Sequence, residues 1–334
     1  MPVAPGSAAI AIAGTYYAVA RHGRRTVDRA RRMTTGLDRR HGSLLVVGVL
    51  AVSFSAVLVR LADDTPKLAI AFYRCGLAAA VLVPVAALRH REELRAVTSR
   101  QRRLAVLSGV FLAAHFASWI PSLSFTTVAA SSVLVTTQPL WVALFGRTIG
   151  ERPSRRALAG IGVALAGTVV IAGGDLGGSG RALIGDALAI AGAIFGAAYV
   201  LSGRNLRRDM SVVPYTAVVY GTAAAILAVV LAVSGTPFVG YEPKVWLLFA
   251  LITIGPQFLG HTVFNYLLGH LEAAVVAIAI MAEPVGATLL ALAILGEAPS
   301  GATIAGGALI LAGVYVAIVA APRARPALLQ TPVD

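Results

Sequence analysis

Charged side chains are scarce in this sequence. Asp, Glu, Lys and Arg together make up 13% of its 334 residues, and apolar residues make up 57%. Soluble domains contain about 25% charged residues. Several stretches have no charge over roughly 20 residues, the length that crosses a bilayer as a helix. The scarcity of charge therefore excludes an ordinary soluble domain and indicates a membrane protein.

Groups that hold disulfides, metals or nucleotides are also few. Cys75 is the only cysteine, so neither an internal disulfide nor a cysteine-based metal site is expected. His261 and His270 have no carboxylate at the spacing of a zinc-binding helix. The glycine-rich segment 173–180 is not followed by Gly-Lys-Ser/Thr, which makes it a linker rather than a phosphate-binding loop. We expect no metal and no cofactor.

The long apolar stretches, which contain few or no charged residues, predict transmembrane helices, because a backbone in lipid must satisfy its own hydrogen bonds. The alternating pattern of an outer-membrane barrel is absent. The ten predicted spans are 44–61, 68–88, 104–122, 127–146, 157–174, 182–202, 212–233, 245–268, 273–295 and 302–321. The predicted fold class is an all-α membrane protein with ten transmembrane helices.

Positive charge gathers on one side of this predicted topology. The net charge is +13. It arises mainly from arginines in the N-terminal tail and in loops that the ten-span topology places on the same side of the membrane. Lipid bilayers retain such loops on the cytoplasmic side. We therefore expect a multi-pass protein of the plasma membrane with both termini cytoplasmic. A nucleic-acid surface would need a folded basic module, and none is evident.

The chain also repeats itself. Glu151-Arg152-Pro153-Ser154 returns as Glu297-Ala298-Pro299-Ser300, and Gly109 and His115 return as Gly255 and His261 at the same spacing. Five spans in each half make the second half enter the membrane from the opposite side, so the halves are predicted to be inverted copies. The predicted organisation is an Arg-rich tail at 1–42, repeats at 43–174 and 182–321, and a second cytoplasmic tail at 322–334.

These motifs resemble the EamA type of the drug/metabolite transporter superfamily. Each half closes with a related motif, Ile149-Gly150-Glu151 or Leu295-Gly296-Glu297, before a glycine-rich last span. The resemblance covers about residues 44–320 and implies two inverted five-helix repeats. Members of the family export amino acids, other metabolites or drugs, and distant relatives carry sugar phosphates and nucleotide sugars.

Polar residues within the spans are the candidates for a substrate site, because each is costly in lipid unless it faces a cavity or a partner. His115 and Trp119 are four residues apart and share a helix face, as do His261 and Asn265. Inverted symmetry brings the two pairs together near the midplane, where repeat transporters bind substrate. The alternative is that both histidines only join helices through hydrogen bonds.

Two repeat-related proline sites add to this set. Gln138-Pro139 in the fourth span corresponds to Glu283-Pro284 in the ninth, and each proline predicts a kink and a freed backbone carbonyl. An ionised Glu283 would lack water at this depth. It is interpreted either as a proton-exchanging group or as a neutral structural residue.

Arg74 and Tyr266 complete the candidate substrate-binding residues. Arg74 lies in the second span and could bind a substrate carboxylate. The alternatives are that it reaches toward the membrane surface or pairs with Asp63 or Asp64. Tyr266, with Tyr199, is a candidate for a cavity wall, although single tyrosines often serve packing.

The function predicted from these residues is secondary transport by alternating access, with proton coupling as one possibility. The expected partners are the bilayer and a small-molecule substrate, namely an exported amino acid or a drug-like amphiphile. An antiporter of the sugar-phosphate or nucleotide-sugar type is the alternative. A membrane enzyme is less consistent, because no nucleophile with its base is found. A channel would show a ring of like residues.

Overall fold

The computed structural model describes residues 39–126, 128–146, 153–173, 180–296, 298 and 301–319. All regular elements in these residues are helices. Seven helical stretches are long and apolar enough to cross a membrane, and they are formed by α2 (Arg39–Leu61), α3 (Lys67–Arg89), α5 (Ser99–Ser122), α9 (Gly180–Leu206), α10 (Val212–Val233), residues Pro243–Leu268 and residues Ala273–Leu295. The chain is therefore an α-helical, multi-pass membrane protein.

Helices also cover the other three predicted spans. The region of 127–146 contains α6 (Val128–Val135) and α7 (Gln138–Phe145), 157–174 falls on α8 (Arg155–Gly173), and 302–321 falls on α15 (Gly301–Val319). Residues 1–38 of the predicted N-terminal tail and the predicted tail at 322–334 lie outside the described residues, as do Glu151, Glu297 and most of the linker. Residues 39–42 of the predicted tail instead begin α2. The count of ten spans remains a prediction.

The fourth and ninth predicted spans are each broken at the same relative place. In the fourth, α6 ends at Val135 and α7 begins at Gln138. In the ninth, α13 (Ala273–Ile280) ends and α14 (Glu283–Leu295) begins at Glu283. Each proline is the second residue of the new helix, where its missing N–H costs no hydrogen bond. The prolines therefore start new helices, whereas the sequence predicted kinks in continuous ones.

The eighth predicted span contains a wide turn that the sequence analysis did not predict. It consists of α11 (Pro243–Ile252), the π-helix η2 (Thr253–Thr262) and α12 (Val263–Leu268). Pro256 lies inside η2, and its lack of an N–H interrupts the ordinary i→i−4 ladder. The π-helix places Gln257 and His261 on the same element, with consequences for the site.

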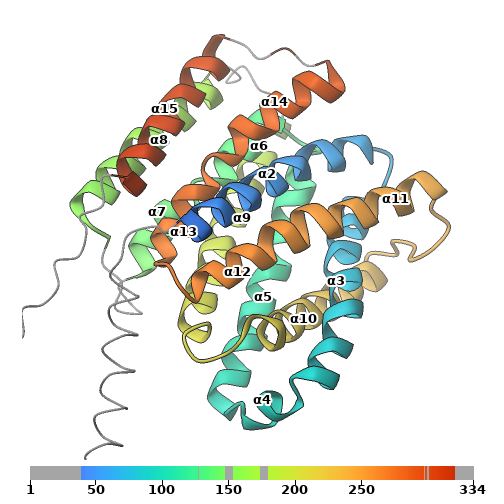
Figure 1. The fold of residues 1–334 in the computed structure, drawn as a ribbon. Helices are drawn as coiled ribbons and strands as arrows, with labels where there is room; N and C mark the ends of the chain where they lie inside the picture. The colour runs from blue at the N-terminus through green and yellow to red at the C-terminus, as the bar shows by residue number, and fades with distance from the viewer. Residues whose placement is uncertain are drawn as a thin grey trace, which may run out of the picture. The chain divides into compact units, whose positions relative to one another are not determined.

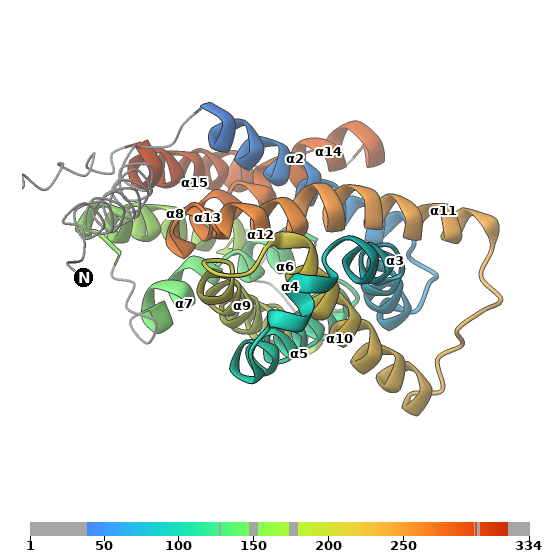
Figure 2. The ribbon, with the colours of Figure 1, turned by 60° about the horizontal axis from the view of Figure 1, so that its bottom comes forward.

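Residues 40–321 form one compact unit, in which helices from the two halves of the sequence pack in pairs. Figure 1 shows α8 beside α15, and Figure 2 shows the same pair from a second direction. The other close pairs are α3 with α10 and α5 with α9. A Cβ added to Gly48 of α2 would lie 2.5 Å from the ring of Phe264, so α2 packs closely against α12. The core between these helices consists of small, aliphatic and aromatic side chains.

Glycines allow α8 and α15 to touch backbone to backbone. A Cβ added to Gly167 would lie 2.4 Å from the carbonyl oxygen of Gly306, and one added to Gly313 would lie 2.5 Å from that of Gly160. Small residues at such contacts let membrane helices approach closely. Gly162 of α8 does not take part in this contact, because a Cβ added to it would have nothing within 4 Å.

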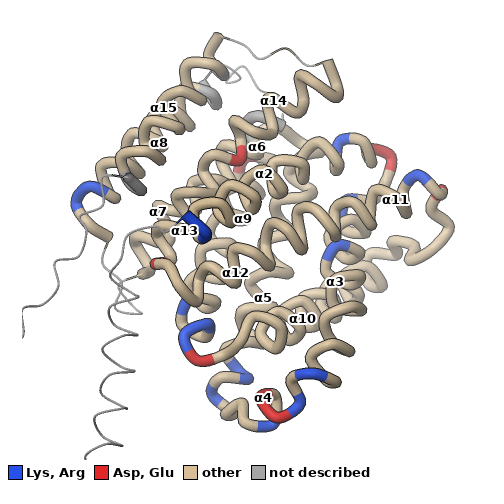
Figure 3. The backbone as a smooth tube through the Cα atoms, viewed as in Figure 1, with Lys and Arg blue, Asp and Glu red and all other residues tan. Residues whose placement is uncertain are grey.

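Charged residues lie mainly at helix ends and around the short helix α4 (Arg91–Ala96), as Figure 3 shows. Glu93 of α4 accepts hydrogen bonds from the backbone N–H and the hydroxyl of Ser211, the residue that precedes α10. Partial burial opposes ionisation of Glu93, but the two Ser211 hydrogen bonds, together with the nearby His90 ring, outweigh it and lower the pKa of the carboxyl below its usual 4.5. This contact joins the two halves of the sequence.

We expect Ser211→Ala to lower the free energy of unfolding by about 1 kcal/mol at neutral pH, because one hydrogen bond to an ionised carboxylate is lost. A lowered pKa contributes stability above the unfolded pKa, and this stability disappears as pH falls through the folded pKa. The difference between variant and wild type should therefore vanish in acid. Thermal melting of purified protein across pH measures it, with Ser202→Ala as control because that hydroxyl bonds within its own helix. An equal loss at all pH values would contradict the account.

Candidate functional site

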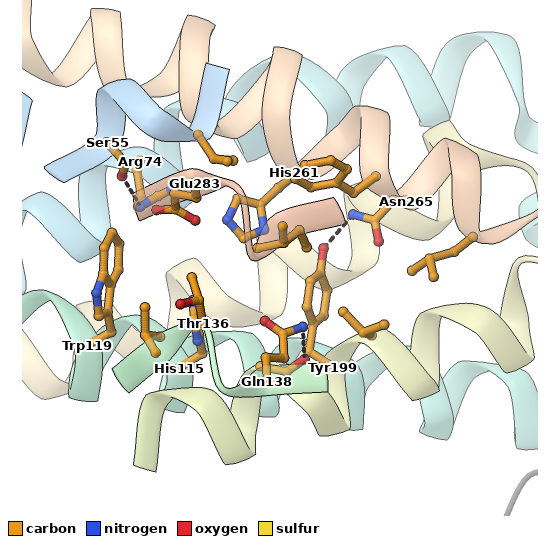
Figure 4. A pocket seen from close by; sticks show the side chains of 17 residues that line it. Ser55, Arg74, His115, Trp119, Thr136, Gln138, Tyr199, His261, Asn265 and Glu283 are labelled. Atoms are coloured by element: carbon orange, nitrogen blue, oxygen red, sulfur yellow. Dashed lines mark hydrogen bonds between the residues drawn. The ribbon is translucent and has the colours of Figure 1, made fainter. Parts of the chain in front are cut away.

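A cavity of about 40 Å³ lies among helices from both halves of the sequence. A water molecule needs roughly 10–15 Å³ in this measure, so the space holds about three waters. Figure 4 shows the polar side chains that surround it. Its polar lining consists of Ser55, Arg74, His115, Trp119, Thr136, Gln138, Tyr199, His261, Asn265 and Glu283.

The structure brings together seven of the eight residues that the sequence singled out for substrate binding. They are Arg74, His115, Trp119, Gln138, His261, Asn265 and Glu283. Tyr266 is not among the lining residues. It instead contacts the rings of His41 and His270 and the guanidinium of Arg40. Consecutive residues of a helix point in different directions, so Tyr266 cannot share the face of Asn265.

The repeat-related histidines meet across the cavity. The ring centroids of His115 and His261 are 6.2 Å apart, and the indole of Trp119 stacks on His115 at 6.1 Å. His115 Nδ1 also lies 2.8 Å from the carbonyl oxygen of Gly192 in α9. His115 therefore both lines the cavity and joins α5 to α9, which combines the two interpretations that the sequence left open.

Glycine in α9 allows side chains of the first half to reach this helix. Gln138 donates a hydrogen bond to the carbonyl oxygen of Gly196 at 3.3 Å. A Cβ on Gly196 would lie 3.0 Å from His115 Nδ1 and 3.1 Å from Gln138 Oε1, closer than side chains normally approach. Gly196 thus sets the width of the cavity at this point.

Arg74 is buried in the cavity wall, with 1% of its surface exposed. Its Nε donates to Gln257 Oε1 at 3.0 Å and its Nη1 to Ser55 Oγ at 3.3 Å. The guanidinium carbon lies 3.9 Å from the centroid of the Phe116 ring, in cation–π contact. The alternative that Arg74 reaches the surface or pairs with an aspartate is wrong: it is buried, and Asp63 forms its ion pair with Lys67.

Glu283 is the first residue of α14 and is 7% exposed. Its backbone carbonyl accepts a hydrogen bond from Ser53 of α2 at 3.3 Å, which ties α14 to the first half. The side chain lies beside Arg74 in Figure 4. Among the described side chains, no ion pair within 4.0 Å joins these two residues. A buried carboxyl of this kind is costly when ionised and alone.

A chain of hydrogen bonds extends from the other end of the cavity. Asn265 Nδ2 donates to the hydroxyl of Tyr199 at 2.5 Å and lies 3.4 Å from that of Tyr220. The Tyr220 hydroxyl lies 3.0 Å from Thr262 Oγ1. Asn265 Oδ1 has no hydrogen-bond partner. The cavity therefore offers an acceptor that a ligand donor could satisfy.

The sequence analysis missed three residues of this region. Thr136 lies at the break before α7 and Ser55 lies one turn from the cavity residue Val52, and both line the cavity. Gln257 stands behind Arg74 on η2. Thr136 could have been inferred from its place beside Gln138-Pro139. Within the described ranges, no group of three or more His, Cys, Asp or Glu side chains is placed to hold a metal ion.

The model of the EamA-like transporter family matches the chain twice, over residues 42–173 and 183–319. The chain belongs to the EamA-like transporter family. This agrees with the resemblance found in the sequence, and the family description identifies a transporter.

Two similar proteins extend the comparison. An uncharacterized transporter of Archaeoglobus fulgidus is 29% identical over 278 residues, which cover 81% of this chain and 94% of that protein. A protein of known crystal structure superimposes with a TM-score of 0.70 at 23% identity, covering 84% of this chain and 97% of the other. At this identity the structural likeness shows the fold alone.

Proposed function

We propose that this EamA-like protein is a secondary active exporter of a small metabolite, an amino acid or a drug-like amphiphile, which works by alternating access at the cavity. The observation that carries the proposal is the cavity itself. It collects buried polar and charged side chains from both halves at the points where two helices are broken. Broken helices at a central site are typical of repeat transporters.

The pattern of helix packing supports two inverted five-helix halves. The fifth and tenth predicted spans pack on each other as α8 and α15, and the second and seventh do so as α3 and α10. The third span packs on the sixth as α5 and α9, while the eighth packs on the first through Gly260 and Val52. Exchanging the halves thus maps one set of contacts onto the other, as a pseudo-two-fold axis requires.

The orientation in the membrane follows from charge. By the positive-inside rule, the basic residues around α4 and after α9 favour the cytoplasmic side. With ten spans, this orientation supports cytoplasmic termini, and the plasma membrane is the proposed location. A reporter fused after Pro326 should be active only as a cytoplasmic fusion. Activity on the external side would overturn the ten-span topology.

The proposed energy source is a proton gradient acting through Glu283. A carboxyl that is buried and has no basic partner within ion-pair distance among the described side chains is costly as an isolated charge. Binding of a proton or of a substrate cation to the Glu283 carboxyl removes this cost in one state of the transport cycle, and the proton or cation is released in the other state. Gln138 occupies the corresponding position of the first half and cannot titrate.

Uptake into everted membrane vesicles tests the proposal. Vesicles that contain the protein should accumulate one class of amino acids or amphiphiles from a labelled panel, and an uncoupler should abolish accumulation above equilibrium. Vesicles carrying the Gly196→Trp variant serve as the control, because an indole at this position would fill the cavity. Equal uptake by both preparations across the panel would count against transport through this cavity.

A further inference from the structure

The guanidinium of Arg74 makes three contacts with the protein, and one of its nitrogens has no hydrogen-bond partner. Gln257 occupies its Nε, Ser55 occupies its Nη1, and Phe116 covers one face. Nη2 has no hydrogen-bond partner although it is buried. Among the described side chains, no carboxylate lies within ion-pair distance of Arg74. A desolvated cation with an unused donor is costly unless a ligand completes it.

We infer that Arg74 is a carboxylate subsite of the cavity and that Gln257 is its positioning residue, so that the cargo carries a carboxylate. The inference rests on the proposed transport function and narrows its substrate class. Carboxylates accept paired N–H donors from an arginine fork in one plane. Gln257 occupies Nε and Ser55 accepts from one of the two N–H groups of Nη1. The cargo is therefore received by Nη2 together with the second N–H group of Nη1.

Gln257 acts from behind the cavity wall. It is completely buried, lies on the π-helix η2, and is not among the lining residues. Its amide oxygen accepts from Arg74 Nε at 3.0 Å, which fixes rotation of the guanidinium about its long side chain. A fixed fork loses less conformational entropy when it binds a ligand. The unusual turn at Gly255-Pro256 thereby contributes to the site.

The charge of the cavity favours a carboxylate over a phosphate. Arg74 is the one Lys or Arg among the lining residues of the described chain, and Glu283 lies on the same wall. A phosphate dianion would bring two negative charges to a single cation, whereas a carboxylate brings one, so the carboxylate leaves the smaller uncompensated charge. This counts against the sugar-phosphate and nucleotide-sugar alternatives.

A carboxylate can come from a simple acid or from an amino acid. Glu283 lines the same cavity as Arg74, and it would accept the ammonium group of an amino acid. Matched probes separate the two sources. They are L-phenylalanine, 3-phenylpropanoate and phenethylamine, together with L-leucine, 4-methylpentanoate and isopentylamine.

Binding of these probes to the purified full-length protein, measured by thermal stabilisation, tests the subsite. At least one carboxylate-bearing probe should bind about 10-fold or more tightly than its matching amine, as expected for a hydrogen bond to a charged group. Tighter binding of the amino acid than of the acid would indicate that Glu283 binds the ammonium group and that the cargo is an amino acid. Equal binding of the two would indicate that the cargo is a simple acid. The subsite would be overturned if both amines bound as tightly as the carboxylate probes that match them. It would also be overturned if no carboxylate probe bound at millimolar concentration.

Variants separate the two residues. Arg74→Gln should weaken carboxylate binding about 10- to 100-fold, and Arg74→Lys, which keeps the charge without the fork, should weaken it less. Gln257→Leu should lower the ratio of carboxylate to amine affinity, which general destabilisation leaves unchanged. The exposed Arg60→Gln is the control. A carboxylate preference that survives Arg74→Gln refutes the inference.

Vesicle flux keeps this result distinct from the proposed function. Transport of the amines alone by wild-type vesicles would refute the carboxylate subsite and leave the exporter intact. Carboxylate binding without flux of any probe in either direction would keep the subsite and refute transport.

Discussion

Replacing Glu283 with glutamine is expected to abolish transport, or to leave a transport rate that no longer changes with pH. Glutamine keeps the shape of the side chain and its place at the start of α14, but it cannot gain or lose a proton. Because Glu283 lines the cavity and is 7% exposed, proton exchange at this depth depends on its carboxyl group and cannot be taken over by bulk water. The rate of uptake into everted vesicles across pH measures the effect.

The matched control is the repeat-related position. Gln138→Glu adds a carboxyl at the corresponding place in the first half, and it should alter the pH profile without restoring the Glu283→Gln variant. Expression and melting temperature of Glu283→Gln should stay near those of the wild type, because the removed charge has no ion-pair partner among the described side chains. Unchanged transport with unchanged pH dependence would make Glu283 a structural residue.

The second large effect is expected where α8 meets α15. Gly313→Ala places a methyl group 2.5 Å from the carbonyl oxygen of Gly160 and 2.6 Å from the amide nitrogen of Ala164. These are backbone atoms that cannot rotate away, so the two helices must separate. Overpacking of this kind costs about 1–3 kcal/mol, and Gly167→Ala should cost as much for the same reason.

Gly162→Ala is the control for this prediction, because Gly162 lies on α8 with Gly160 and Gly167 but a Cβ added to it would have nothing within 4 Å. It should be neutral or slightly stabilising, since alanine favours helix more than glycine does. Melting of the purified variants in one detergent gives the comparison. Equal melting temperatures for Gly313→Ala and Gly162→Ala would contradict the backbone contact between α8 and α15.

Much of the helical pattern could be predicted from the sequence, because membrane spans depend on simple composition. Uncharged stretches located the helices, and residues four apart located the pairs His115 with Trp119 and His261 with Asn265. Tyr266 was assigned to the cavity without regard to its direction on the helix, and the structure places it outside. Helical spacing alone could have excluded it.

The remaining features depend on contacts that no local pattern records. Arg74 is far from Gln257 in the sequence, and their hydrogen bond forms only because η2 turns Gln257 toward α3. Pro256 alone could not have predicted the π-helix, since a proline can kink, break or widen a helix. The starts of α7 and α14 at repeat-related prolines show the second outcome. Such choices are made by tertiary packing.

Alternating access to the cavity is the central claim, and cysteine accessibility tests it directly. Cys75 is the only cysteine in the sequence, so Cys75→Ala gives a background without thiols. Thr136→Cys then places one thiol in the cavity lining, and Leu289→Cys places one on the outward surface of α14, where the native side chain is 60% exposed.

A membrane-impermeant thiol reagent is applied to right-side-out and to everted vesicles. The account predicts that the cavity thiol reacts from both sides and is protected by transported cargo, whereas the control thiol reacts from neither, because a thiol in lipid does not ionise. Reaction of the cavity thiol from one side only, with or without cargo, would contradict the account.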